Sequence, residues 1–349
     1  MTIRTIDFRY RVLRNGGDYC EIYPVGDSMP AIEMNDEGEI KTSLTGEFIM
    51  PQLELNWLTD EILPEMTLNG ETRKLGRFLA ARVEEQDDGI TKSLQIEAYD
   101  RGWLVRDSRA ESRPFFAAET NYLDAIGSAL VAAGITDIRE VPTDAVLTED
   151  REDWECGTSW LEVANQLLRE INYNDVWFDA EGVCILEPVS MSGEENIDHV
   201  LDESSVESMM SPGGHKTTDY YATPNVFICI CSNADKADAM VAVAENVNPE
   251  SPLSIPRRGR RISTVIQINN IASMEELQLF AERQVVDSLR TGEIIQIETA
   301  LLPGFGVGDI TALRYNGELS LCKERGWIMQ LGVGGKMTHT LEKVVYNLG

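Results

Sequence analysis

Residues Gln95 to Ala133 read QIEAYDRGWLVRDSRAESRPFFAAETNYLDAIGSALVAA. The stretch begins with an alternating run typical of a β-strand and then crosses a charged connector that contains a proline. It ends in a helical pattern over residues 122–133, with Thr120 or Asn121 suited to cap the helix and Gly134 to end it. The chain therefore changes here from β structure to α/β structure.

Residues 1–105, before this change, carry the pattern of short strands throughout. Two alternating runs, Arg9–Leu13 and Tyr19–Tyr23, flank Asn15-Gly16-Gly17, which is a strong hairpin signal. A further strand is predicted at Leu53–Trp57. Many short strands at this spacing are typical of a barrel or a sandwich.

One run in this region is ambiguous between helix and strand. Residues Phe78–Val83 have helical propensity, but a turn signal at Asp87-Asp88-Gly89 then leads into the alternating run Ser93–Tyr99. We therefore predict a hairpin.

Residues 106–198 form a middle segment with α/β character. Ser159 and Glu162 have the spacing of a capping box, which predicts a helix beginning at residue 160. A hairpin follows over residues 175–188. Trp177 and its neighbour Phe178 then point to opposite faces. Either one of them is exposed to a partner, or both pack under neighbouring elements.

Residues 199–349 return to β structure with one helix. Asn225–Cys231 is an apolar run suited to a buried strand, and Ala237–Ala244 is its predicted hairpin partner. The helix is predicted over Ser273–Leu289. Strands are predicted at Ile294–Leu301, Ile310–Tyr315, Trp327–Gly332 and Met337–Val345. The fold class is thus α+β, mainly β, with three domains at 1–105, 106–198 and 199–349.

The charge of the chain is its most unusual bulk property. It holds 30 Lys and Arg against 59 Asp and Glu, a net charge of −29. Such a surface repels nucleic acid phosphates, so we expect no stable nucleic-acid binding. General solubility, or a source organism whose proteins are acidic, is the favoured explanation of the charge unless a partner accounts for it.

Several classes of site are not indicated. The six cysteines contain no CxxC pair, and Cys229 and Cys231 are predicted to be buried and reduced rather than metal-bound. Paired carboxylates lie in polar, loop-like segments, and no nucleophile motif occurs. No apolar run approaches the ~20 residues that span a bilayer, and the N-terminus lacks the apolar centre of a signal peptide. We expect no enzyme activity, no cofactor, no metal and no membrane anchor.

The one basic cluster in this acidic chain consists of Arg257, Arg258, Arg260 and Arg261. No aromatic residues are interleaved with it, so contact with a protein is favoured over contact with nucleic acid. Salt bridges within the chain are an alternative interpretation. The candidate protein-contact residues are these four arginines and Trp177.

Three groups of segments together resemble the hub proteins of phage tail baseplates, including those of prophages and of contractile tail-like particles. The first is LQIEAYDRGWL at Leu94–Leu104 with TNYLDAI from Thr120. The second is GTSWLEVA at Gly157–Ala164 with INYNDVWFDAEG at Ile171–Gly182. The third is NPESPLSIPRRGR at Asn248–Arg260, and the resemblance covers about residues 90–345.

This resemblance implies a fold and a set of partners. In that family two tube-like β-barrel domains flank a small α/β domain, so that a homotrimer makes a pseudo-sixfold ring. The ring connects the tail tube protein to the spike protein, beside other baseplate or tape-measure proteins. The chain would be made in the bacterial cytoplasm and assembled into a virion tail or tail-like particle. An acidic lumen would let DNA pass without sticking.

Two alternative functions stay open at this stage. One is a tail-associated peptidoglycan hydrolase, since some relatives of tail hubs carry such a domain. The other is a receptor-binding or carbohydrate-binding tail module that uses Trp177 or Tyr220-Tyr221.

Overall fold

The computed structural model describes residues 5–87, 89–189, 197–205, 209–218, 224–231, 240–249, 251–268, 274–288 and 293–343. The chain divides into two compact units. The N-terminal unit contains Met1–Ser190, Glu298–Gly308 and Arg325–His339. The C-terminal unit contains Met191–Ile297, Asp309–Glu324 and Thr340–Gly349.

Strands account for 47% of the structure and helices for 14%, so the predicted mainly β fold is confirmed. No closed barrel is found among the strands of the described residues. The two tube-like domains and the three domain boundaries remain predictions.

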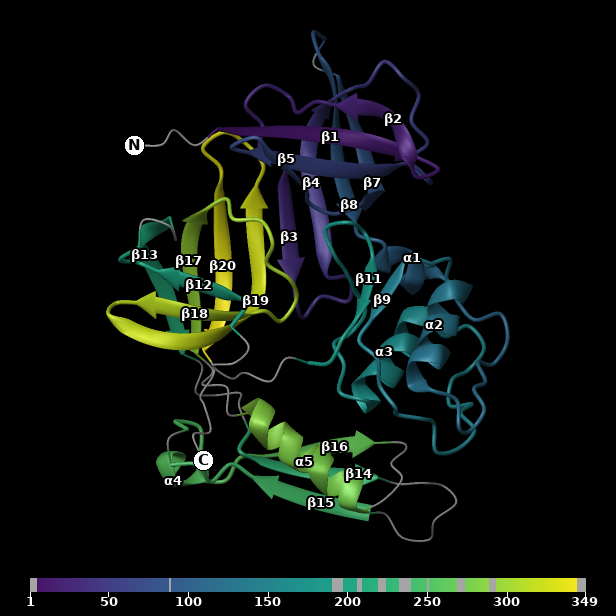
Figure 1. Cartoon of the computed structure of the whole chain (residues 1–349), viewed down its shortest axis with the longest axis vertical. Helices are drawn as coiled ribbons and strands as arrows, with labels where there is room; N and C mark the ends of the chain where they lie inside the picture. The colour runs from purple at the N-terminus through teal and green to yellow at the C-terminus, as the bar shows by residue number, and fades with distance from the viewer. Residues whose placement is uncertain are drawn as a thin grey trace. The chain divides into compact units, whose positions relative to one another are not determined.

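Eight strands open the N-terminal unit: β1 (Ile6–Arg14), β2 (Gly17–Ile22), β3 (Ala31–Asn35), β4 (Thr42–Ile49), β5 (Glu61–Leu68), β6 (Glu71–Lys74), β7 (Phe78–Asp87) and β8 (Lys92–Tyr99). Seven of them follow the order β3-β4-β8-β7-β5-β1-β2, and β6 pairs with β5 (Figure 1). The β1–β2 turn has positive φ at Asn15 (53°) and Gly16 (77°), as a two-residue hairpin turn requires. The predicted β7–β8 hairpin is likewise present.

The prediction of a strand at Leu53–Trp57 is wrong, because this segment lacks strand pairing and the strand lies further on, at β5. Asp60 ends the segment. Its carboxylate accepts hydrogen bonds from the backbone N–H of Asn56 (2.8 Å) and from the Arg14 guanidinium (2.7 and 2.9 Å). These bonds fold residues 56–60 into a turn. The sequence pattern does not predict β5, because the strand contains Pro64 and proline is depleted in strands.

The middle of the chain folds as α1 (Gly102–Asp107), α2 (Tyr122–Ala132), α3 (Trp160–Glu170) and a three-stranded sheet of order β10-β11-β9. These strands are β9 (Ile138–Glu140), β10 (Trp177–Phe178) and β11 (Cys184–Leu186). The predicted caps are confirmed, because the Asn121 side chain accepts from the N–H of Leu123 (2.8 Å) and Ser159 Oγ accepts from the N–H of Glu162 (3.1 Å). The predicted stop at Gly134 has φ of 87°.

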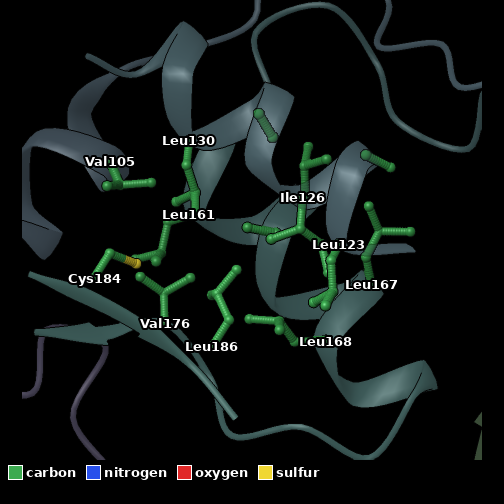
Figure 2. Close-up of a cluster of buried hydrophobic side chains, with 14 of the residues drawn as sticks. Val105, Leu123, Ile126, Leu130, Leu161, Leu167, Leu168, Val176, Cys184 and Leu186 are labelled. Atoms are coloured by element: carbon green, nitrogen blue, oxygen red, sulfur yellow. The ribbon is translucent and has the colours of Figure 1, made fainter. Parts of the chain in front are cut away.

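Helices α2 and α3 bury apolar faces against β11 in one hydrophobic core. Figure 2 shows Ile126 and Leu130 of α2 directed toward Leu161 and Leu168 of α3, with Leu186 of β11 beside them. The helical spacing of these residues in the sequence predicts this contact.

A buried arginine holds the end of α3. Arg151 makes two parallel hydrogen bonds to the carboxylate of Glu170 (2.6 and 2.9 Å), bonds Asp153, and lies 5.3 Å from the ring centroid of Trp154. Its side chain is only 4% exposed, so loss of the Glu170 carboxylate would leave a buried guanidinium without its two-bond partner.

A buried carboxyl group lies where β8 meets α1. Asp100 accepts hydrogen bonds from the backbone N–H groups of Gly102 and Thr42, both at 2.8 Å. Burial raises the pKa of Asp100 to about 6, although these two N–H groups favour its charged form.

Strands from the end of the chain complete the N-terminal unit. Residues 326–330 of β19 (Glu318–Gln330) pair antiparallel with β3, from Gly326↔Asn35 to Gln330↔Ala31. The Tyr10 hydroxyl also donates to the carbonyl of Leu331 (3.0 Å), so segments about 300 residues apart meet in one sheet.

The C-terminal unit begins with β12 (His199–Asp202), which pairs parallel with β18 (Ile310–Tyr315), and β13 (Met210–Thr218), which neighbours β17 (Glu293–Ala300). β20 (Lys336–Lys343) follows β17 in the strand order. Strand β19 starts earlier than predicted, because Asn316 (φ 52°) and Gly317 (φ 75°) make a tight turn that pairs Ile310–Tyr315 with residues 318–323.

A separate small sheet of the C-terminal unit has the order β15-β14-β16, with β14 (Val226–Cys231), β15 (Met240–Glu245) and β16 (Ser263–Ile268). The predicted β14–β15 hairpin is confirmed, and β16, which was not predicted, pairs parallel with β14. Helix α5 (Met274–Ser288) lies across this sheet (Figure 1). The predicted capping residue Ser273 lies outside the described residues.

Candidate interaction surface on an arginine loop

The four arginines singled out in the sequence lie on one loop, residues 246–262, which we call the arginine loop. It connects β15 to β16 and contains the short helix α4 (Ile255–Arg258). The structure thus brings these four predicted residues together. Trp177 belongs to the N-terminal unit.

Two fully buried asparagines anchor the arginine loop. The Asn225 side chain donates to the carbonyls of Leu253 (3.2 Å) and Arg260 (3.0 Å) and accepts from the N–H of Ile262 (2.7 Å). The second asparagine, Asn246, has its own backbone N–H bonded to the carbonyl of Asn225 (2.9 Å). Both ends of the loop, Asn246 and Ile262, are therefore bonded to Asn225, directly before β14.

The interior of the loop is also bonded internally. The Asn246 side chain donates to Ser251 Oγ (3.0 Å), and the Asn246 carbonyl accepts from the N–H of Ile255 (2.9 Å). Ser251 is fully buried, as is Leu253, so the loop has a small core of its own. A loop held in this way presents its exposed side chains at little further cost in conformational entropy.

The arginines differ in their surroundings. Arg257 and Arg260 are exposed, and neither forms an ion pair with a carboxylate among the described residues. Arg261 pairs with Glu245 at the end of β15. Arg258 is half-buried, in the last turn of α4, which ends at Gly259 with φ of 65°. Arg261 thus takes part in a salt bridge within the chain, and Arg257 and Arg260 present their guanidinium groups to solvent in the part of the chain that the structure describes.

Trp177 occupies a different setting. It pairs with Ile185 across the β10–β11 hairpin and is half-buried, whereas its neighbour Phe178 is buried in the hydrophobic core of the helices. The Nε1 atom of Trp177 is buried and has no hydrogen-bond partner among the described residues. Tyr220 and Tyr221 lie outside the described residues.

Two of the cysteines lie in the core of the small sheet. Cys229 and Cys231 are buried under α5 with Ala242, Ala244 and Leu277. No group of three metal-ligating side chains occurs in the part of the chain that the structure describes. None of the described helices is long and apolar enough to cross a membrane.

Asn225 and Asn246, the residues that build the loop, were not predicted as such. Asn225 is the first residue of the predicted strand Asn225–Cys231, and Asn246 follows the predicted strand Ala237–Ala244, where asparagine is an ordinary turn residue. Their burial depends on the return of β16 beside β14, and no local pattern reports that pairing.

Comparison with known proteins bears on the fold of the whole chain. The sequence matches no family model and no curated protein. A tail protein from Neisseria meningitidis MC58 has a TM-score of 0.69 at 13% identity, over 96% of each chain. The 43 kDa tail protein of prophage MuSo2 from Shewanella oneidensis gives 0.68 at 10% identity, over 96% of this chain and 98% of that one.

A third solved structure is the prophage tail protein gp18 from Listeria monocytogenes EGD-e. It gives a TM-score of 0.61 at 11% identity, over 96% of this chain and 94% of that one. Identities this low establish the likeness for the fold alone, and at that level the resemblance drawn from the sequence is confirmed: this chain has the fold of phage tail proteins.

Proposed function

We propose that this chain is a structural hub protein of a phage tail or of a contractile tail-like particle. Three copies form a pseudo-sixfold ring that connects the tail tube to the central spike. The observation that carries this proposal is the match to tail proteins over nearly the whole length of both chains. A match of that extent includes all the domains in their order along the chain, and not only one domain that many unrelated proteins share.

The proposal includes the three-domain plan. Residues 1–105 and 199–349 supply two tube-like β domains, and residues 106–198 supply the α/β domain between them. Two such domains in each of three copies give the six equivalent positions that a sixfold tube presents. The strand-rich ends of the chain and the helices α1–α3 between them support this plan.

The role is mechanical rather than catalytic in this proposal. The net charge of −29 supports an acidic lumen through which DNA slides without binding. The arginine loop supports a contact with an acidic protein surface, because its exposed guanidinium groups are held on a fixed backbone.

Cryo-electron microscopy of the assembled particle tests the proposal. Three copies of the chain are expected at the junction of tube and spike, with the acidic side chains turned toward the lumen. Six copies, or a position away from that junction, would contradict the hub. A neutral or basic lumen would remove the explanation offered for the charge while leaving the hub intact.

A cell-wall assay separates this role from a peptidoglycan hydrolase. The purified chain, added to a turbid suspension of cell walls, is expected to leave the turbidity unchanged beside a lysozyme control. Clearing that is lost on substitution of a single acidic residue would favour the hydrolase.

A further inference from the structure

Among the described residues, a helix covers one face of the small sheet of the C-terminal unit: α5 lies across it (Figure 1). Leu277 and Ala281 of α5 are buried in one cluster with Cys229, Ala242 and Ala244. Side chains alternate between the two faces of a strand, so the residues between these buried positions point the other way.

The opposite face has an apolar centre of five β-branched side chains, which we call the valine face: Ile228, Ile230, Val241, Val243 and Val265. The strand register places Ile228 beside Val243 on one side and Val265 on the other, and places Ile230 between Val241 and Gln267. The polar side chains Ser263, Gln267 and Glu245 lie on the same face and border this centre. The three valines are 46%, 44% and 56% exposed, and both isoleucines are half-buried.

An apolar face of this kind needs a physical explanation. Polar residues are typical of the solvent side of an antiparallel or mixed sheet, and a contiguous exposed apolar patch marks an interaction site. Three strands about 4.8 Å apart and six residues long make a face of roughly 280 Å². That is about a third of the ~800 Å² per partner in a standard interface. The valine face alone is therefore too small for a standard interface, and a contact through it would need its neighbours as well.

The arginine loop lies at one end of the valine face. Glu245 continues the alternation of Val241 and Val243 along β15, and Arg261 forms its ion pair with Glu245. The apolar face is thus continuous with the basic loop.

The charge of the loop indicates which surface it meets. Outside these four arginines the chain holds 26 basic residues (30 − 4) against 59 acidic ones. The surface of a second copy is therefore strongly acidic and complementary to the exposed Arg257 and Arg260.

We propose that the valine face and the arginine loop together form a contact between copies of this chain. The apolar side chains are buried against the neighbouring copy, and the arginines at the edge meet its acidic surface. This inference rests on the proposed function, since it names the surface through which copies of the hub associate.

Sedimentation equilibrium of matched variants tests the inference. Val265→Lys places a charge on the valine face. Leu279→Lys is the control, because Leu279 is equally exposed (55%) but lies on α5, which packs on the other face of the sheet. Self-association is measured up to the highest attainable concentration, since the small area predicts a weak contact. Val265→Lys is expected to weaken the association constant about tenfold or more, and Leu279→Lys to leave it unchanged.

A second variant guards against misfolding as the cause. Arg257→Glu combined with Arg260→Glu changes two exposed side chains outside every strand and is expected to weaken association in the same direction. Unchanged association in both the lysine and the glutamate variants would overturn the inference, as would a wild-type chain that stays monomeric at every concentration.

Particle assembly then separates this inference from the hub proposal. A particle with three copies at the junction, whose assembly tolerates Val265→Lys, would retain the hub and reject the contact. A variant that self-associates normally but fails to enter particles would show that the valine face binds a different tail protein, which also rejects the contact between copies.

Discussion

Replacement of Asn225 by alanine tests whether one buried side chain sets the shape of the arginine loop. The substitution removes three hydrogen bonds to backbone groups at Leu253, Arg260 and Ile262. It leaves the strand pairing of β14 intact, since that pairing uses backbone atoms of other residues. Asn225→Asp keeps the shape of the side chain but turns an oxygen toward the two carbonyls that the amide bonds.

The expected cost follows from the number of bonds. A hydrogen bond within a protein contributes about 0.5–1.5 kcal/mol to stability. Three bonds at about 1 kcal/mol each, two of them only partly buried, give about 3 kcal/mol, and the aspartate variant is expected to lose at least as much. A free energy of about 3 kcal/mol corresponds to about 100-fold in the equilibrium for opening the loop.

Hydrogen exchange followed by mass spectrometry measures that equilibrium segment by segment. Peptides that cover residues 246–262 are expected to exchange about 100-fold faster in Asn225→Ala than in the wild type. Peptides from α2 and α3 in the other unit are expected to be unaffected.

Gln267→Ala is the matched control, because Gln267 is exposed on β16 of the same sheet. Loop exchange within about threefold of the wild type in both Asn225 variants would refute the reasoning. It would mean that the loop holds its shape without these bonds, through Asn246 and Ser251 alone.

Three further predictions concern other parts of the chain. Burial raises the pKa of Asp100 from 3.8 to about 6, so the folded state favours the protonated carboxyl group. The contribution of Asp100 to the free energy of unfolding is therefore fully present below pH 4 and is lost as the pH rises through 6. The unfolding free energy of the wild type minus that of Asp100→Asn should therefore fall by about 2–3 kcal/mol between pH 4 and pH 7 in urea titrations, and a constant difference would contradict this. Glu170→Gln leaves the buried guanidinium of Arg151 without its two-bond partner and should cost about 1–3 kcal/mol in urea unfolding, whereas Arg113→Met, at an exposed ion pair, should cost under about 1 kcal/mol. In the native protein a thiol reagent should modify the exposed Cys156 rapidly. It should leave Cys184 and Cys322 unmodified until the protein unfolds, because burial raises the pKa of these two thiols to about 12. Rapid labelling that persists in the Cys156→Ser variant would contradict this assignment.

Local signals in the sequence predict those elements whose partners are close along the chain. Asn15-Gly16 identifies the β1–β2 hairpin, and Ser159 with Glu162 identifies the start of α3. The β7–β8 hairpin shows that the position of a turn outweighs helical propensity.

Two missed hairpins carried a signal that could have been used. Asn69-Gly70 joins β5 to β6, and Asn316-Gly317 joins β18 to β19, each with positive φ at both residues. The same Asn-Gly rule that identifies the first hairpin predicts both of them.

Other features were beyond the reach of local patterns. Strand β16 is recognised only through its parallel pairing with β14, and the valine face only through the register of three strands. The buried state of Asn225 follows from the same distant pairing. Features that depend on contacts between residues far apart in the sequence cannot be predicted from local periodicity and spacing.

The pairing of β3 with the second half of β19 also affects synthesis of the chain. Asn35 pairs with Gly326, so one edge of β3 stays unpaired until nearly all of the polypeptide has left the ribosome. At about 5–20 residues per second the delay is roughly 15–60 s, during which the nascent sheet offers unpaired amides and carbonyls to any other extended segment. Unfinished or prematurely terminated chains therefore lack the strand that pairs with β3, and this unpaired edge favours their aggregation.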